Sequence, residues 1–298
     1  MTAATGHAPV PSTVVTATPR TRRWQALSLR GVGWIGYTSA AIIAVATLLA
    51  IFGPLLAPFP PNQSDLSHAF VGPTPAHPLG FDSQGRDLLS RLLVGARSSM
   101  LGALIVVVVS ITAGTALAVI AAWRRGWVDS VISSGSNLVF AFPGLLLAVL
   151  AAAVFGPSQW SAALALSVAY TPYVARLMRG VALAERSLPY IEALEVQGSS
   201  AWSIGVRHLL PNIAPLLVAQ ATILFGWAAL DLAAVSFLGL GVTPPQADWG
   251  VMVSEGQTGV LQGFPAEALI AGTALVLVII SFNILGERLN DRQDRQRS

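Results

Sequence analysis

The residue types that most often carry covalent catalysis or bind metal ions are scarce in this chain of 298 residues. It has no cysteine and no lysine, which excludes a thiolate nucleophile, a Schiff-base lysine and the phosphate-binding lysine of a P-loop. Its four histidines are scattered and form no HExxH pattern, so we expect no metal site. Few catalytic options remain for such a chain.

The composition indicates an integral membrane protein. Hydrophobic residues make up 54% of the chain and charged residues only 10%, and the mean hydropathy is +0.66. A soluble globular domain carries roughly 25% charged residues. The net charge of +3 comes from arginines at the ends of apolar runs, which favours a role in membrane orientation over nucleic-acid binding.

Six apolar runs are long enough to cross a bilayer as helices. They cover approximately residues 34–58, 100–123, 128–155, 160–178, 213–238 and 267–285. We therefore predict an all-α integral membrane protein. We expect residues 1–30 to form a disordered basic tail. Residues 31–98 should contain the first span, an outer loop and a short interfacial helix over 87–97. Residues 99–289 should form the main transmembrane core, and residues 290–298 a second tail.

The arginine distribution predicts the topology. Six spans place both termini on one side, and if that side is the cytoplasm, most arginines of the tails and loops lie inside. This agrees with the positive-inside rule, which counts basic residues. Three arginines fall outside, namely Arg86, Arg91 and Arg97, and we expect them to pair with Asp82 and Asp87.

Four polar residues within the predicted spans are candidates for a substrate pathway: Ser136, Asn137, Asp231 and Ser236. Polar side chains in a span usually face other helices or a water-filled path, and an ionisable group there is costly enough to suggest function. Asp231 leaves two possibilities open. It lines the pathway, or it lies near the outer interface, hydrated or paired with an arginine of a neighbouring chain. Pro143 should kink or break the third span.

Residues 187–212 form a polar island between the fourth and fifth spans. Ile191 and Leu194 fall at helical spacing, Gly198 offers the positive φ of a helix end, and a second short helix passes through Trp202. Pro211 should end that helix, because proline disfavours helical backbone in the residue before it. Helix caps are predicted at Ser187, at Ser199 or Ser200, and at Asn212. We predict a helix, a glycine turn and a second helix on the water side of the membrane.

This island resembles the EAA loop of bacterial ABC importer permeases, with the pattern Glu-Ala-Ala, three residues, Gly, nine residues and Ile-x-Leu-Pro. The matching residues are Glu192, Ala193, Leu194, Gly198, His208 and Pro211. Leu194 and His208 depart from the pattern. The ending His-x-Leu-Pro-Asn, preceded by Arg207, is similar to the C-type permease subunit of dipeptide, oligopeptide and nickel importers. Residues 77–97, HPLGFDSQGRDLLSRLLVGAR, resemble a second signature of this family, and we favour a structural role for them over substrate contact.

The resemblance implies a type I ABC importer permease fold with about six transmembrane helices in the bacterial plasma (inner) membrane, both termini being cytoplasmic. The EAA loop would be the coupling helix, in which Ile191, Leu194 and Trp202 give apolar contact to an ATPase groove, Gly198 gives the turn and Glu192 satisfies the loop backbone or an arginine. The implied partners are a second homologous permease, two ATP-binding subunits, an extracytoplasmic substrate-binding protein and membrane lipid. The chain would not be an enzyme and would bind no cofactor, since ATP and Mg belong to the ATPase subunits.

Other functions remain possible on the sequence alone. A permease for nickel or another small solute shares the scaffold, because the separate binding protein largely sets selectivity in this family. A free-standing secondary transporter is less favoured, since such carriers usually need several intramembrane charges and Asp231 is nearly alone. A membrane enzyme is the least favoured. The resemblance implies a heterodimer, although one chain leaves a homodimer open.

Overall fold

The computed structural model describes residues 33–297, with side chains described as far as residue 291. The predicted tail over residues 1–30 lies outside the described residues. Within them the chain is helical, with one isolated β-bridge between Phe81 and Asp87. The α-helices are α1 (Gly33–Leu56), α2 (Leu88–Arg124), α3 (Gly126–Phe140), α4 (Gly144–Phe155), α5 (Gln159–Arg186), α6 (Pro189–Val196), α7 (Ala201–Ile204), α8 (Leu210–Phe237), α9 (Trp249–Leu261) and α10 (Ala266–Arg297). A 3₁₀ turn, η1, covers Leu66–His68, and a π-helical turn, η2, covers Gly205–Leu209.

All six predicted spans coincide with helices of the described chain, but these helices differ in apolar character. Four segments are each long and apolar enough to cross a membrane: α1, α2, residues 201–237 ending in α8, and residues 266–291 of α10. The pair α3 and α4 makes a fifth if it is one span, bent by 81° beside Pro143 as predicted. α5 has 28 residues but is less apolar, since it carries Tyr170, Thr171 and Tyr173 in its middle and three arginines in its second half.

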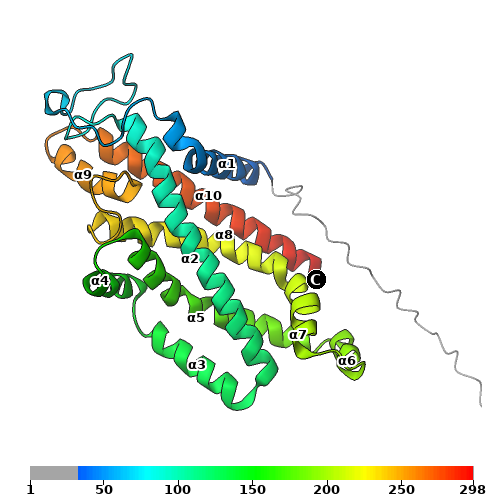
Figure 1. The fold of residues 1–298 in the computed structure, drawn as a ribbon. Helices are drawn as coiled ribbons and strands as arrows, with labels where there is room; N and C mark the ends of the chain where they lie inside the picture. Colours follow the sequence, from blue (N-terminus) through cyan, green and yellow to red (C-terminus); the bar gives the residue numbers. More distant parts are fainter. Residues whose placement is uncertain (1–32, 298) are drawn as a thin grey trace, which may run out of the picture. The chain divides into compact units, whose positions relative to one another are not determined.

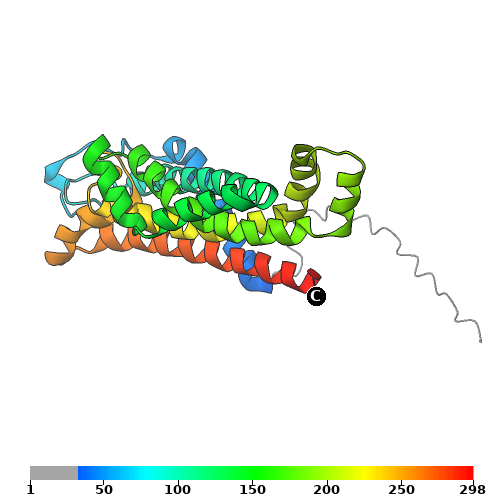
Figure 2. The same cartoon turned by 90° about the horizontal axis from the view of Figure 1, so that it is seen from below.

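The long helices pack in pairs along most of their length. α2 packs on α5 and also contacts α1 and α8, while α10 packs on α8, α1 and α9 (Figure 1). Figures 1 and 2 both show α6, α7 and the end of α10 at one end of the bundle. α9 and residues 57–87 lie at the other end, which we call the α9 end. The polar island and the end of α10 therefore lie at the same end of the bundle. This agrees with the prediction that two spans, the fifth and the sixth, separate them along the chain.

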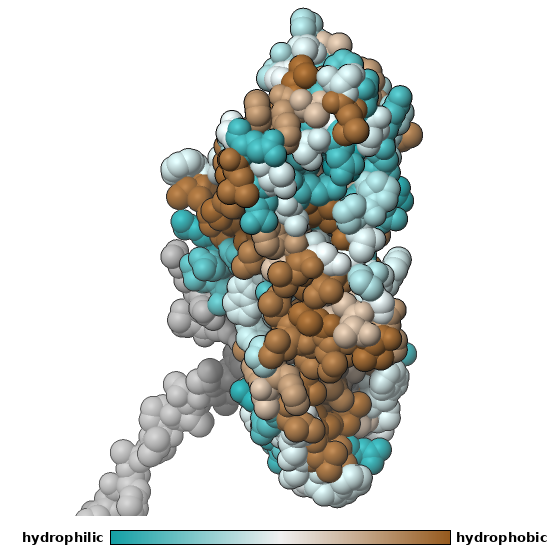
Figure 3. Space-filling view, turned by 90° about the vertical axis from the view of Figure 1, so that its left-hand side faces the viewer, coloured by the Kyte–Doolittle hydropathy of each residue, from teal (hydrophilic) through white to brown (hydrophobic). Residues whose placement is uncertain are grey.

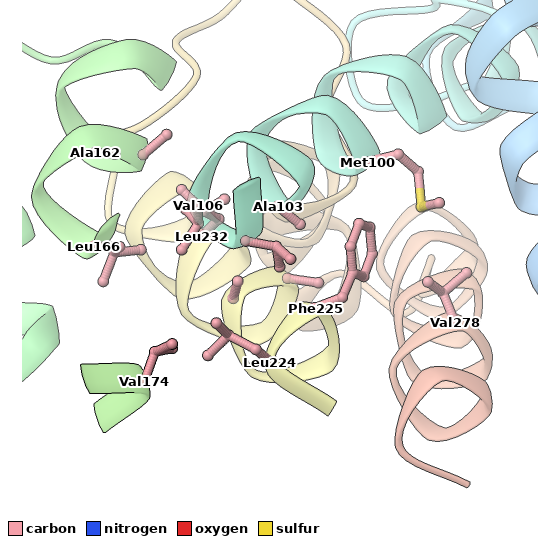
Figure 4. Close-up of a cluster of buried hydrophobic side chains, with 14 of the residues drawn as sticks. Met100, Ala103, Val106, Ala162, Leu166, Val174, Leu224, Phe225, Leu232 and Val278 are labelled. Atoms are coloured by element: carbon pink, nitrogen blue, oxygen red, sulfur yellow. The ribbon is translucent and has the colours of Figure 1, made fainter. Parts of the chain in front are cut away.

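The core consists largely of small and medium apolar side chains. Ala103 and Val106 of α2 lie among Leu166 of α5 and Leu232 of α8, and Met100 points towards α10 (Figure 4). Such side chains let helices approach closely, and packing of this kind drives helix association in lipid. The face of the molecule drawn in Figure 3 carries a broad apolar (brown) band, and this suits a bundle that faces lipid or another subunit.

α9 is a helix that the sequence does not predict, because its glycine- and proline-rich surroundings suggest an irregular loop. Asp248 caps α9 by accepting hydrogen bonds from the N–H groups of Gly250 and Val251, over 2.9 and 3.2 Å. A Cβ on Gly256 would lie 2.6 Å from the backbone nitrogen of Ala268 in α10. The glycine that lowers helix propensity thus lets α9 lie directly on α10.

The structure also corrects the start of the second span. A separate interfacial helix is predicted over residues 87–97, but α2 runs unbroken from Leu88 to Arg124. Asp87 caps it by accepting a hydrogen bond from the N–H of Ser90 (2.8 Å). No proline occurs in this stretch, so nothing ends the first turns before the apolar segment begins.

We expect Gly256→Ala to destabilise the protein, because the new methyl group must displace the backbone of α10. Overpacking of this kind typically costs about 1–3 kcal/mol. Gly135→Ala is the matched control: Gly135 is exposed on α3, a Cβ added there would meet no other atom within 4 Å, and alanine should stabilise this helix by roughly 0.5–1 kcal/mol. Thermal unfolding in detergent should show a lower Tm for Gly256→Ala alone. The same Tm for both variants would contradict the packing role.

Candidate functional site

A buried charge cluster lies at the α9 end of the bundle. Arg86 and Arg91 are at most 1% exposed, and both donate to Oε2 of Glu255 in α9, over 2.8 and 2.6 Å. Arg86 Nε also donates to Asp82, whose Oδ2 lies 3.5 Å from Nε of Arg91. Two carboxylates thus hold two guanidinium groups away from water, and this joins residues 82–91 to α9.

This cluster explains why Arg86 and Arg91, two of the three arginines that the predicted topology places outside, can lie on that side: their charges are paired with carboxylates. Burial disfavours the charge of Arg86, but Glu255 and Asp82 outweigh this effect and raise the pKa of its guanidinium above the usual value. The predicted pairing with Asp82 is confirmed for Arg86 and Arg91. Arg97 is exposed, and no ion pair of Arg97 occurs among the described residues.

Asp87 is predicted to pair with an arginine, but its partners in the structure are Ser90 and His77. Besides capping α2 it accepts a hydrogen bond from the Ser90 hydroxyl (2.6 Å), and its Oδ1 lies 2.9 Å from Nδ1 of His77. The His77 ring stacks on Phe59 and lies against Phe81, with centroids 4.2 and 4.3 Å away. The polar and aromatic side chains of residues 77–90 thus contact one another and Phe59 within this chain. These contacts support a structural role for the segment over direct contact with substrate.

At the opposite end of the bundle, the polar island folds as two helices around a glycine turn, as predicted. α6 ends at Val196, Gly198 has φ +79°, and α7 starts at Ala201. Ser200 caps α7 by accepting a hydrogen bond from the N–H of Ser203 (3.2 Å). The φ of Gly198 lies in the region that favours glycine, so the change of chain direction depends on this residue.

The predictions for Ser187 and Pro211 are wrong. Ser187 does not cap α6, because its hydroxyl donates to the carbonyl of Ala184 within α5. Pro211 does not end the second helix, since the chain continues through the π-helical turn into α8. The Leu210 N–H reaches back five residues to the carbonyl of Gly205. This wider turn relieves the clash that a proline ring makes with the carbonyl four residues earlier.

A hydrogen-bonded group fastens both ends of the loop to the bundle. Asn212 does not cap α8 as predicted; its side-chain amide donates to Oε1 of Glu185 (3.0 Å) and to the hydroxyl of Tyr190 (2.9 Å). Tyr190 donates to the same Glu185 oxygen over 2.8 Å. The end of α5 and the starts of α6 and α8 therefore meet at one carboxylate.

Arg186 links the loop to α2. Its Nη1 donates to the carbonyls of Ala122 and Trp123 over 2.7 and 3.0 Å, and its Cζ lies 5.2 Å from the Trp123 ring centre. Its Nη2 lies 3.7 Å from Oε1 of Glu195 in α6. A cation at a helix C-terminus satisfies carbonyl groups that have no partner within the helix. Sequence patterns did not reveal Glu185 and Arg186, because several of their partners, Asn212, Ala122 and Trp123, lie 27 to 64 residues away.

The loop side chains divide into buried anchors and exposed contacts. Ile191 is fully buried, so the prediction that it contacts a partner groove is wrong; like Ile204, it packs within this chain. Trp202 and Val196 are 80% and 89% exposed. The other predicted loop residues are exposed (Glu192, Ala193, Gly198, Arg207) or partly exposed (Leu194, His208, Pro211). The exposed side of α6 and α7 is available to another chain.

Asp231 lines a cavity of about 300 Å³ between α3, α4, α5 and α8. Its Oδ2 accepts a hydrogen bond from the Tyr170 hydroxyl over 2.8 Å. No ion pair of Asp231 occurs among the described residues. The cavity is lined by Phe140, Phe142, Pro143, Gly144, Ala169, Tyr170, Tyr173, Trp227 and Asp231. Asp231 therefore faces a cavity, as the first of its two possibilities requires, and it has no arginine partner within the described chain.

The other three pathway candidates do not line this cavity. Ser236 is buried, and its hydroxyl accepts a hydrogen bond from the N–H of Val242 (3.3 Å), which shapes the turn after α8. Asn137 is exposed on α3 and accepts a hydrogen bond from Arg176 (2.8 Å), and Ser136 is partly exposed beside it.

The aromatic lining is the part of the cavity that sequence patterns did not reveal. Tyrosine and tryptophan usually gather at the membrane interfaces. Tyr170, Tyr173 and Trp227 instead lie towards the middle of long helices, and this position is the signal that would have revealed them.

Comparisons with known proteins agree with this arrangement. Residues 114–298 match the family model "Binding-protein-dependent transport system inner membrane component", and residues 34–73 match "N-terminal TM domain of oligopeptide transport permease C". A probable D,D-dipeptide transport system permease of Escherichia coli is 37% identical over 262 residues, 86% of each chain. A dipeptide transport system permease of Alkalihalophilus pseudofirmus is 37% identical over 254 residues (85% of this chain, 83% of the relative), and a glutathione transport system permease of Pectobacterium atrosepticum is 33% identical over 261 residues (87% and 86%).

A multi-pass helical bundle with these matches is a transport permease of the bacterial inner membrane. The chain belongs to the family of binding-protein-dependent transport system inner membrane components, the permeases of ABC importers. The resemblance to the C-type group is confirmed by the match to the N-terminal domain of oligopeptide permease C. Family membership implies ATPase and binding-protein partners.

We expect Glu255→Gln to lower the stability of the protein, because two buried guanidinium groups would then keep Asp82 as their one ion-pair partner among the described residues. Removing one partner of a buried ion pair typically costs about 3–5 kcal/mol. Asp65→Asn is the control: it breaks a pair with His68 in which both side chains are about half exposed, and it should leave the Tm unchanged. An unchanged Tm for Glu255→Gln in detergent would show that the cluster does not hold α9 in place.

Proposed function

We propose that this chain is the permease subunit of an ATP-driven importer of small peptides. The observation that carries this proposal is the similarity to permeases named for D,D-dipeptide, dipeptide and glutathione transport, at 33–37% identity over 85–87% of the chain. The cavity at Asp231 supports it, since about 300 Å³ is at the small end of ligand-site volumes.

In this proposal α6 and α7 seat in a groove of a cytoplasmic ATPase subunit. Trp202 and Val196 provide exposed apolar contact, and Glu192 is free to meet an arginine. Glu185 and Arg186 then pass the displacement on, because they join the loop to α2, α5 and α8. α5 and α8 also carry Tyr170 and Asp231, so movement of the loop alters the cavity.

The proposed assembly contains a second homologous permease that completes the path, two ATP-binding subunits and an extracytoplasmic substrate-binding protein. ATP and Mg bind to the ATPase subunits, and this chain binds no cofactor and catalyses no covalent step. Both termini are placed in the cytoplasm. The buried pairing of Arg86 and Arg91 supports this topology, because their charges are neutralised within the outer segment.

The function is tested by reconstituting the chain in liposomes with its permease partner, ATPase subunits and binding protein. We expect ATP-dependent uptake of labelled dialanine that needs every component. Uptake without the ATPase would contradict the role as an ABC permease. Absence of peptide uptake by a complex whose ATPase responds to the binding protein would contradict the substrate class.

We expect Glu192→Arg and Gly198→Pro to uncouple ATP hydrolysis from uptake while the chain still inserts. Glu192 is exposed, so reversing its charge disturbs a partner rather than this fold. Proline fits neither the positive φ of Gly198 nor the hydrogen bond from its N–H to the carbonyl of Glu195 (3.0 Å). Uptake per ATP hydrolysed should fall at least about tenfold, which corresponds to 1.4 kcal/mol.

Glu287→Arg and Gly198→Asn are the matched controls for these two changes. Glu287 is an exposed glutamate on α10, outside the loop, and asparagine tolerates positive φ better than other residues with a side chain. Both controls should retain coupled uptake. Normal coupling in both test variants would refute the assignment of α6 and α7 to the ATPase contact.

A further inference from the structure

We propose that the cavity at Asp231 recognises the positively charged amino terminus of a peptide as it passes through the membrane. This inference rests on the proposed peptide function and names the group of the substrate that this chain binds. It is carried by the contacts of one carboxylate and by the rings that share its cavity.

The carboxylate of Asp231 has unused capacity for a cation. Oδ2 accepts a hydrogen bond from Tyr170, whereas no described residue donates to Oδ1. A carboxylate offers about four lone-pair positions, so one hydroxyl leaves most of them free. The ion pairs of the described residues do not include Asp231. Since an unpaired charge within a span is costly, a partner that arrives with the substrate is the natural complement.

Aromatic rings provide the second half of the site. Phe140, Phe142, Tyr170, Tyr173 and Trp227 line the same cavity as Asp231. Tyr173 and Trp227 lie 5.6 Å apart between centroids, tilted by 56°. The faces of such rings attract ammonium groups, and a carboxylate among several rings is a typical recognition site for an organic cation.

One ring of this wall already contacts a cation within the chain. The guanidinium carbon of Arg176 lies 4.7 Å from the centroid of Phe140. Arg176 donates a hydrogen bond to the side chain of Asn137 (2.8 Å), and no ion pair between Arg176 and Asp231 occurs among the described residues. Arg176 therefore leaves the carboxylate of Asp231, which lines the cavity, without a cationic partner in the described chain.

An ammonium group fits these observations better than a metal ion. Asp231 is the only carboxylate among the residues that line the cavity, and no histidine lines it. Calcium and magnesium take about six or more oxygen ligands, and aromatic rings supply none of them. Every unmodified linear peptide carries an amino terminus whatever its side chains are, so this site would accept peptides of varied sequence.

The first test compares uptake of dialanine by reconstituted complexes that carry Asp231→Asn, Asp231→Glu or Asp291→Asn. Asp231→Asn keeps the shape and removes the charge, and we expect the uptake rate to fall at least about tenfold. Asp231→Glu keeps the charge and should recover a substantial part of the rate. Asp291→Asn makes the same chemical change at an exposed position of α10 and should transport at the wild-type rate. ATPase stimulation by the loaded binding protein should persist in all three variants, which shows that they are assembled.

A second measurement uses N-acetyl-dialanine, which lacks the ammonium group, with the binding protein loaded to the same extent with each peptide. In the wild-type complex dialanine should be taken up faster than its acetylated form. In Asp231→Asn the ratio of the two rates should fall towards one. This ratio is informative even if the variant assembles in lower yield.

The outcomes separate this inference from the proposed function. Wild-type uptake by Asp231→Asn, an unchanged ratio between the two peptides, or equal loss in Asp231→Asn and Asp231→Glu would each overturn the ammonium site while peptide transport by the complex stands. Failure of the wild-type complex to take up any peptide would instead remove the proposed function itself.

Discussion

A charged side chain that packing withdraws from water is stabilised by hydrogen-bonded and oppositely charged groups of the protein, because the packed interior supplies neither water nor free ions. This requirement shapes both ends of the molecule. At the α9 end, Glu255 draws Arg86 and Arg91 into one buried cluster. At the loop end, Glu185 and Arg186 connect the ends of four helices. Each cluster joins segments that are distant in sequence. These ion pairs and hydrogen bonds therefore help to position the helices, in addition to the packing of the apolar core.

The Glu185 and Arg186 cluster is also connected to the cavity through two helices. α5 runs unbroken from the cavity to the loop, with Tyr170 and Glu185 about four turns apart on one rod. α8 starts beside Asn212 and carries Asp231 near its other end. In the proposed coupling mechanism, a displacement of α6 would reach the carboxylate and its hydroxyl partner through these two helices. A change in their relative position changes the one hydrogen bond that Asp231 accepts from the described chain.

Local patterns in the sequence were sufficient for the spans and for the helix, turn and helix of the loop. Apolar run length and the single residue Gly198 determine these features without reference to distant contacts. The errors arose where tertiary contact overrides a local rule. Gly256 reads as a loop residue but permits close packing of α9, and Pro211 reads as a helix end but is accommodated by a π-helical turn. Ile191 has the spacing of a contact residue, yet its burial is set by neighbours that spacing does not reveal.

The environment of Asp231 differs from those of Asp248 and Asp129 in a way that bears on transport. Asp248 accepts hydrogen bonds from two backbone N–H groups and from Ser99, and Asp129 holds a bidentate pair with Arg179. Both are satisfied by the fold alone. Asp231 receives one hydroxyl and faces a cavity with room for a solute. A fully paired carboxylate would bind no substrate, and a deep multi-carboxylate site would hold a cation too strongly to release it. One charge surrounded by rings lies between these limits, as passage through a membrane requires.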